Sequence, residues 1–91
     1  MTDPLAPLRA RFRLRAAEDL TRLQALRQAG DAAELRRLAH GISGAAGTFG
    51  FPDLSEAAGR IDDDYVAGQT PTSEAFARLE RALEAAAASG D

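Results

Sequence analysis

The sequence predicts an all-α protein whose helices form an up-down antiparallel four-helix bundle. In four segments apolar residues recur at spacings of three and four, and glycine or proline separates these segments. No segment alternates apolar and polar residues with a period of two, so we expect no sheet. Short connections between long amphipathic helices favour antiparallel neighbours. The 91 residues can enclose one modest core, so residues 1–91 are expected to form a single domain.

The first helix is expected at about residues 5–29. Pro4 and Pro7 are compatible with its first turn, where proline costs no hydrogen bond, and Gly30 suits its C-terminal end. Its buried face is expected to comprise Leu5, Leu8, Phe12, Ala16, Leu20, Leu23 and Leu26.

The second helix is expected at residues 32–49, with Asp31 as its N-cap and Glu34 completing a capping box. It ends near Gly50. The residues expected on its buried face are Leu35, Leu38, Ile42, Ala45 and Phe49.

The third helix is expected at residues 53–66, where Asp53 and Glu56 repeat the capping-box spacing. The fourth is expected at residues 72–88, after a start signal at Thr70-Pro71 or Thr72, and it frays into residues 89–91. The expected buried residues are Leu54, Ala57 or Ala58, Ile61 and Tyr65 in the third helix, and Phe76, Leu79, Leu83 and Ala86 or Ala87 in the fourth.

Composition excludes several classes of function. The net charge of −3 argues against general nucleic-acid binding, which needs a basic field. The chain has no cysteine, so it has no disulfide, thiolate metal site or cysteine nucleophile. No apolar run is long enough to cross a membrane, and the N-terminal stretch is not of signal-peptide type. We therefore expect a soluble, cytoplasmic protein. The arginines of the first half and the acidic run at 62–64 are interpreted as solvated helix faces.

His40 is the only histidine of the chain and the strongest candidate for a functional residue. At about 100° per residue, it lies almost opposite the apolar cluster of the second helix and therefore faces solvent. Its neighbours one turn away are Arg36 and Arg37 before it, and Ser43 and Gly44 after it.

Three glycines lie inside this helix, at Gly41, Gly44 and Gly47. Each costs about 0.8–1 kcal/mol relative to alanine, which is otherwise the habitual small residue of the chain. Either the glycines let a partner approach the imidazole, or they let another helix pack closely. The shared face with His40 favours access at Gly44 and Gly47, whereas both interpretations stand equally at Gly41.

The residues available near His40 limit its chemistry. A metal site needs three or four ligands, and neither a second histidine nor a cysteine is present. Ser43 lacks the strained elbow and oxyanion loop of a catalytic triad. No cofactor motif occurs. What remains is the imidazole as a nucleophile, with Arg36 and Arg37 able to pair with a phosphoryl group on it. An inert surface histidine is the competing interpretation.

The stretch from Leu38 to Gly50, LAHGISGAAGTFG, resembles the phosphoacceptor segment of histidine-containing phosphotransfer (HPt) domains. The family pattern is A-H-x-[LI]-K-G-[SA]-[SA]-x-x-[LIFV]-G, followed by an apolar helix of the type L-x-x-x-A-x-x-[LI]-[ED]. The continuation is matched by Leu54, Ala58, Ile61 and Asp62. The resemblance covers residues 5 to 88, and its specific motif lies within residues 38–62.

The resemblance implies a phosphorelay. An HPt domain accepts a phosphoryl group on its histidine from the phospho-aspartate of a receiver domain, or from a kinase, and passes it to another receiver. The receiver supplies Mg²⁺ and most catalytic groups, so the HPt protein is a carrier and not an enzyme. By this resemblance His40 is the phosphoacceptor, Gly44 is the small residue that leaves it open, and the expected partners are a receiver domain, a histidine kinase or both. We expect a monomer.

The sequence departs from the family pattern at Ser43, where the family usually has a lysine thought to hold the phosphoryl group. One hypothesis is that Arg36 or Arg37 compensates from the preceding turn. The alternative function is a docking module that binds a kinase or receiver without transfer. A third alternative is that the helices dimerise and His40 is incidental.

Overall fold

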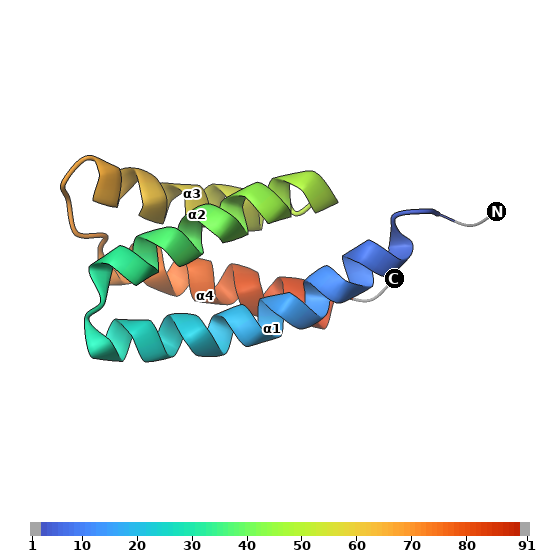
Figure 1. Cartoon of the computed structure of the whole chain (residues 1–91), viewed down its shortest axis with the longest axis horizontal. Coiled ribbons are helices and arrows are strands. Elements are labelled where there is room, and N and C mark those ends of the chain that lie inside the picture. Colours follow the sequence, from blue (N-terminus) through green and yellow to red (C-terminus); the bar gives the residue numbers. More distant parts are fainter. Residues whose placement is uncertain (1–2, 90–91) are drawn as a thin grey trace.

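A computed structural model describes residues 3–89 and contains four helices (Figure 1). They are α1 (Ala6–Ala29), α2 (Ala32–Phe49), α3 (Pro52–Val66) and α4 (Ser73–Ala88). The described residues include no strand. The all-α prediction is confirmed, and each helix boundary lies within one residue of the expected position.

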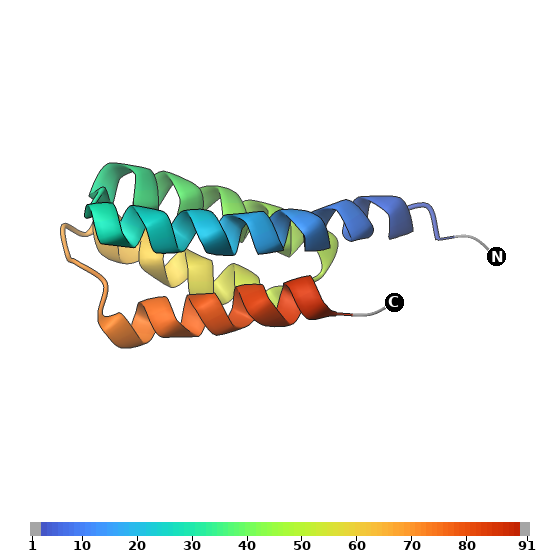
Figure 2. The same ribbon diagram turned by 90° about the horizontal axis from the view of Figure 1, so that it is seen from below.

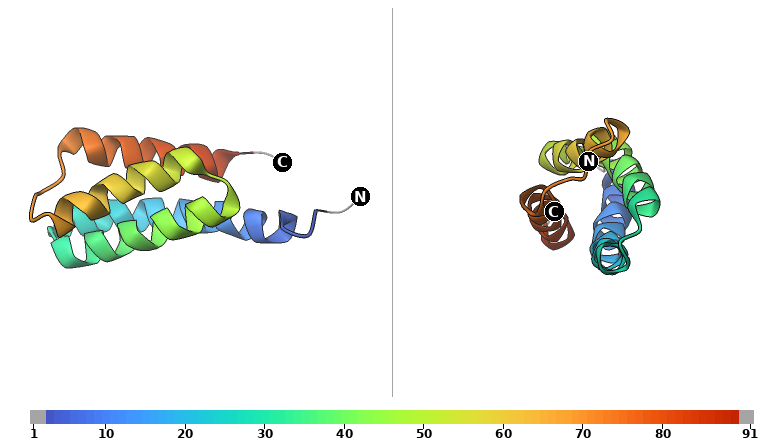
Figure 3. Two further views of the ribbon diagram at one scale, coloured as in Figure 1. Left: turned by 90° about the horizontal axis from the view of Figure 1, so that it is seen from above. Right: turned by 90° about the vertical axis from the view of Figure 1, so that its left-hand side faces the viewer.

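The helices alternate in direction along the bundle (Figure 1), and the end-on view in Figure 3 shows them arranged around a common axis. Each helix packs against its neighbours in the chain, and α1 also packs against α4. The beginning of α1 and the end of α4 therefore lie at the same end of the bundle (Figure 1). The antiparallel four-helix bundle is confirmed.

The buried core comprises Phe12, Ala16, Leu23, Leu35, Ala39, Ile42, Ala46, Leu54, Ala57, Ala58, Ile61, Phe76, Leu79, Leu83 and Ala86. Leu20, Leu26, Leu38, Ala45, Phe49, Tyr65 and Ala87 are partly buried against it. The expected stripes of the four helices are thus largely confirmed. Ala57 and Ala58 are both buried, because α3 is contacted by α2 on one side and by α4 on the other.

The first turns of α1 correct the predicted core. Leu5 and Leu8 are 46% and 41% exposed, although they continue the apolar stripe. With 24 residues α1 is the longest helix, and its N-terminal turns extend past the ends of α2 and α4 (Figure 2). Helical periodicity is present there, but no neighbouring helix covers the stripe.

The helix ends follow the predicted signals with two corrections. Asp31 and Thr72 cap α2 and α4 by accepting the backbone N–H of Glu34 and Ala75, and Gly30 ends α1 in the left-handed conformation with φ of 68°. The Asp31 N–H donates to the Leu26 carbonyl, so the predicted capping box is only half formed.

The N-terminus of α3 is the second correction. Phe51 occupies the N-cap position and Pro52 begins the helix, which places Asp53 in the first turn. Proline is suited to this first position because its φ is fixed and its missing N–H would be unpaired anyway. Asp53 still interacts favourably with the helix dipole, but it does not cap the helix, and the predicted box with Glu56 does not form.

None of the helices within residues 3–89 combines the length and apolar character needed to cross a membrane. Residues 90 and 91 of the predicted C-terminal fray lie outside the described residues. For the candidate site the important feature is the close antiparallel packing of α2 against α3.

Candidate functional site

His40 lies near the middle of α2, and its side chain is 73% exposed. The neighbouring Ala39 and Ile42 are buried, so the helix itself turns position 40 outward. This confirms the predicted solvent-facing position. The ring is open to a partner, and it is too exposed to exclude water from a reaction by itself.

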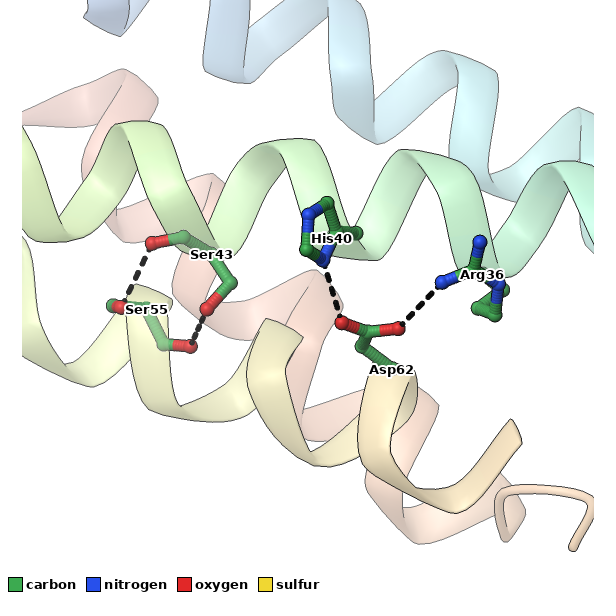
Figure 4. Close-up of polar contacts among 5 residues, drawn as sticks. All are labelled: Arg36, His40, Ser43, Ser55 and Asp62. Carbon is green, nitrogen blue, oxygen red and sulfur yellow. Dashed lines mark hydrogen bonds and ion pairs between the residues drawn. The ribbon is translucent and has the colours of Figure 1, made fainter. Parts of the chain in front are cut away.

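The imidazole is held from α3 by Asp62. Its Nδ1 atom lies 2.8 Å from Oδ2 of Asp62 (Figure 4). An ionised carboxylate can only accept hydrogen bonds, so Nδ1 carries the proton and donates it. In the neutral ring Nε2 then holds the available lone pair. Asp62 thus selects the tautomer and the nitrogen that can act as a nucleophile.

Arg36 completes a three-residue array with Asp62 and His40. Its Nη1 atom is 3.2 Å from Oδ1 of Asp62, while His40 binds the other carboxylate oxygen (Figure 4). Asp62 is only 15% exposed, so its charge interacts with these two partners in partly desolvated surroundings. The guanidinium offsets this negative charge, which would otherwise repel an anion approaching His40.

The other arginine proposed from the sequence lies differently. Arg37 forms an ion pair with Glu34 one turn earlier on α2, and its side chain is 71% exposed. Of the two candidates, only Arg36 shares a carboxylate with His40.

Ser43 faces α3. Its hydroxyl donates to the Ser55 carbonyl at 3.0 Å, and the Ser55 hydroxyl donates to the Ser43 carbonyl at 2.8 Å (Figure 4). Both bonds are partly buried. Ser43 therefore links α2 to α3, and its hydroxyl proton is not directed toward the imidazole.

The three glycines of α2 have different surroundings. A Cβ atom at Gly44 would have nothing within 4 Å, so the surface at this position, one turn after His40, is open to solvent. At Gly41 it would lie 3.7 Å from the end of the flexible Arg15 side chain, and at Gly47 it would lie 3.4 Å from Ser55 Oγ. The open surroundings of Gly44 fit the predicted access, which stays a prediction, whereas Gly47 borders α3, as the alternative interpretation of close helix packing expects.

Sequence reasoning missed Asp62 as a site residue. It matched the last position of the family motif but was interpreted as part of a solvated acidic run. The available signal was that motif position together with the expected antiparallel packing of the second and third helices, which can bring Asp62 close to His40 although the two are distant in the sequence. Ser55 was also missed, because hydrogen bonds from a hydroxyl to the backbone of another helix leave no periodic pattern in the sequence.

Comparison with known proteins identifies one family. A family model described as "Hpt domain" matches residues 7–89. No curated protein and no solved structure matches the chain.

Proposed function

Because the chain belongs to the Hpt domain family, we propose that it carries a phosphoryl group on His40 within a two-component phosphorelay. The donor is the phospho-aspartate of a receiver domain or a histidine kinase, and the acceptor is another receiver. The observation that carries the proposal is the exposed His40 ring with Nδ1 bound to Asp62 at 2.8 Å. A buried or unoriented ring would not offer one defined nitrogen to a second protein.

The transfer step uses the Nε2 lone pair. As Nε2 bonds to phosphorus, the bond between phosphorus and the donor aspartyl oxygen breaks, and the donor carboxylate leaves with that electron pair. The ring keeps its Nδ1 proton and becomes positively charged, and Asp62 stabilises this charge. The reverse step restores the neutral ring. The receiver brings Mg²⁺ and its own catalytic groups, so this chain acts as a carrier and is not an enzyme alone.

Within this proposal Arg36 is the residue that steadies the phosphoryl group. It lies one helical turn before His40, and its guanidinium has donors beyond the one used with Asp62. Replacing Arg36 with alanine is expected to slow phosphotransfer more than replacing Arg37, which pairs with Glu34. Equal transfer rates in the two variants would contradict this assignment.

A panel of receiver domains, each phosphorylated with labelled phosphate in the presence of Mg²⁺, tests the function. Acid-labile, alkali-stable label should appear on the wild-type chain and be absent from His40→Gln. Circular dichroism should show equal helix content in both proteins, because the His40 side chain is exposed. Label that persists in His40→Gln would reject His40 as the acceptor.

The placement of Ser43 favours a second candidate, a docking module without transfer. This position faces α3 and places no cation beside His40. Tight binding to a receiver or kinase, with no label from any phosphorylated receiver, would support the module. We expect a monomeric, cytoplasmic protein in either case.

A further inference from the structure

Helices α2 and α3 carry the same short pattern, a serine followed four residues later by a glycine. The pattern is Ser43 to Gly47 in α2 and Ser55 to Gly59 in α3. In the structure the two copies face one another. A Cβ atom at Gly59 would lie 3.3 Å from Ser43 Oγ, and one at Gly47 would lie 3.4 Å from Ser55 Oγ. We call these four residues the serine–glycine crossing.

Each hydroxyl in this crossing reaches the opposite backbone. Ser43 donates to the Ser55 carbonyl at 3.0 Å, and Ser55 donates to the Ser43 carbonyl at 2.8 Å. The opposing glycines leave room for the two hydroxyls. Because hydrogen bonds are directional, the crossing holds the two helices at one relative position along their axes.

The same register brings His40 to Asp62. His40 lies three residues before Ser43 on α2, and Asp62 lies three residues after Gly59 on α3. In an antiparallel pair, a register that sets Ser43 against Gly59 therefore also sets His40 against Asp62 (Figure 4). A sliding movement of one helical turn, about 5.4 Å, would break both sets of contacts.

Half of the buried apolar residues of these two helices resist sliding only weakly. Of the eight, four are alanines, Ala39, Ala46, Ala57 and Ala58, and four are larger, Leu35, Ile42, Leu54 and Ile61. A methyl group protrudes little into the grooves of a neighbouring helix, so it resists sliding less than a large branched side chain does.

We propose that the serine–glycine crossing sets the α2–α3 register in which Asp62 holds Nδ1 of His40. Ser43 and Ser55 are then positioning residues, which act on the imidazole through Asp62. The consequence for phosphotransfer rests on the proposed function, whereas the consequence for the His40 tautomer does not.

The test is the tautomer of His40 in the double variant Ser43→Ala with Ser55→Ala. Nitrogen-15 NMR of the imidazole needs no assignment, because the chain has one histidine. The wild-type protein should show a protonated Nδ1 and an unprotonated Nε2 at a pH where the ring is neutral. The double variant should lose this preference, and transfer from a phosphorylated receiver should fall about tenfold because the nucleophile is displaced.

Ser89→Ala is the matched control. It removes a hydroxyl that likewise donates to a backbone carbonyl, that of Ala86, but it lies at the end of α4. In this variant the His40 tautomer and the rate of phosphotransfer should equal those of the wild type. A folded double variant with the wild-type tautomer would overturn the proposal.

A disulfide tests whether the register itself is what His40 needs. Ser43→Cys with Gly59→Cys, in a chain that also carries Ser55→Ala, removes both hydroxyl bonds and introduces the only two cysteines of the chain. The 3.3 Å between Ser43 Oγ and a Cβ at Gly59 places the two side chains within reach of a cystine. The oxidised protein should regain the wild-type tautomer that the reduced form loses.

An oxidised protein without that tautomer, or a reduced one that retains it, would overturn the proposal. The two proposals also fail separately. If the tautomer responds as expected but even the wild type accepts no phosphoryl group, the register inference stands and the phosphocarrier function falls. If the wild type accepts the phosphoryl group but the tautomer does not respond to the variants, the phosphocarrier function stands and the register inference falls.

Discussion

The α1–α4 and α2–α3 interfaces use different means of holding two helices together. Between α1 and α4 the Arg27 guanidinium stacks on Phe76 at 4.5 Å, and both helices contribute large, fully buried side chains to the core: Leu23 from α1, and Leu79 and Leu83 from α4. Between α2 and α3, small residues and reciprocal hydroxyl bonds lie beside His40 and Asp62. We expect the first interface to act through stability alone, and the second also to fix the position of His40, the proposed phosphoacceptor.

The largest expected effect is on stability, from Leu79→Ala on the buried face of α4. Leu79 is 0% exposed, and its truncation leaves a cavity that should lower the free energy of unfolding by about 2–5 kcal/mol. Chemical denaturation measures the loss. The tautomer of His40 in the remaining folded protein should not change.

Leu14→Ala is the matched control, because Leu14 is 70% exposed and the chemical change is the same. Its effect should stay within about 0.5 kcal/mol. A similar loss in both variants, or a changed His40 tautomer in Leu79→Ala, would contradict the division of roles between the two interfaces.

Asp62→Asn tests the α2–α3 interface through the contact between Asp62 and His40. The amide retains the shape of the carboxylate but not its charge, so it neither enforces the Nδ1 proton nor stabilises the charged ring. We expect phosphotransfer to fall about tenfold, with a smaller preference for the Nδ1-protonated tautomer. Transfer kinetics and nitrogen-15 NMR measure the two effects.

The adjacent Asp63 is exposed, and Asp63→Asn makes the same change in net charge. It should leave transfer unchanged. If both variants slowed transfer equally, the effect of Asp62 would be one of general charge rather than of its contact with His40.

A smaller effect is expected from Arg27→Ala in the α1–α4 interface. Arg27 loses both its stacking on Phe76 and its 2.7 Å ion pair with Glu80, which should cost about 1 kcal/mol of stability. Arg22→Ala removes a longer pair with Glu34, at 3.4 Å, and should cost less. Thermal denaturation ranks the two variants, and the opposite ranking would show that the stack contributes little.

The smallest effect concerns Asp19, a second partly buried carboxylate. Burial raises the pKa of Asp19, and its pairing with Arg15 at 3.5 Å offsets this only in part. Because the folded-state pKa lies above the unfolded one, Asp19 favours folding when protonated. That contribution is complete at pH values below the unfolded pKa and is lost as the pH rises through the folded pKa.

Asp19→Asn should therefore raise stability slightly at pH 7, by less than about 0.5 kcal/mol, and this gain should vanish in acid. Denaturation at a series of pH values measures it. Glu18→Gln, at an exposed neighbouring position, controls for net charge. A loss of stability at pH 7 in Asp19→Asn alone would show that the pair with Arg15 outweighs the cost of burial.

The sequence by itself determined the local features of this protein. Apolar residues at spacings of three and four specify each helix and its buried face, and signals such as Asp31 and Gly30 specify where helices begin and end. The exposure of His40 follows from the same periodicity, because a residue opposite the apolar stripe must face outward. These properties depend on neighbours within about one turn, which are visible in the chain itself.

Only the tertiary structure decided how the helices meet. It exposed Leu5 and Leu8 where no other helix covers α1, turned Ser43 toward Ser55, and brought Asp62 to Nδ1 of His40. The contact between His40 and Asp62 joins residues 22 positions apart. Such contacts depend on the register and rotation of one helix against another, which the pattern of a single helix does not specify by itself.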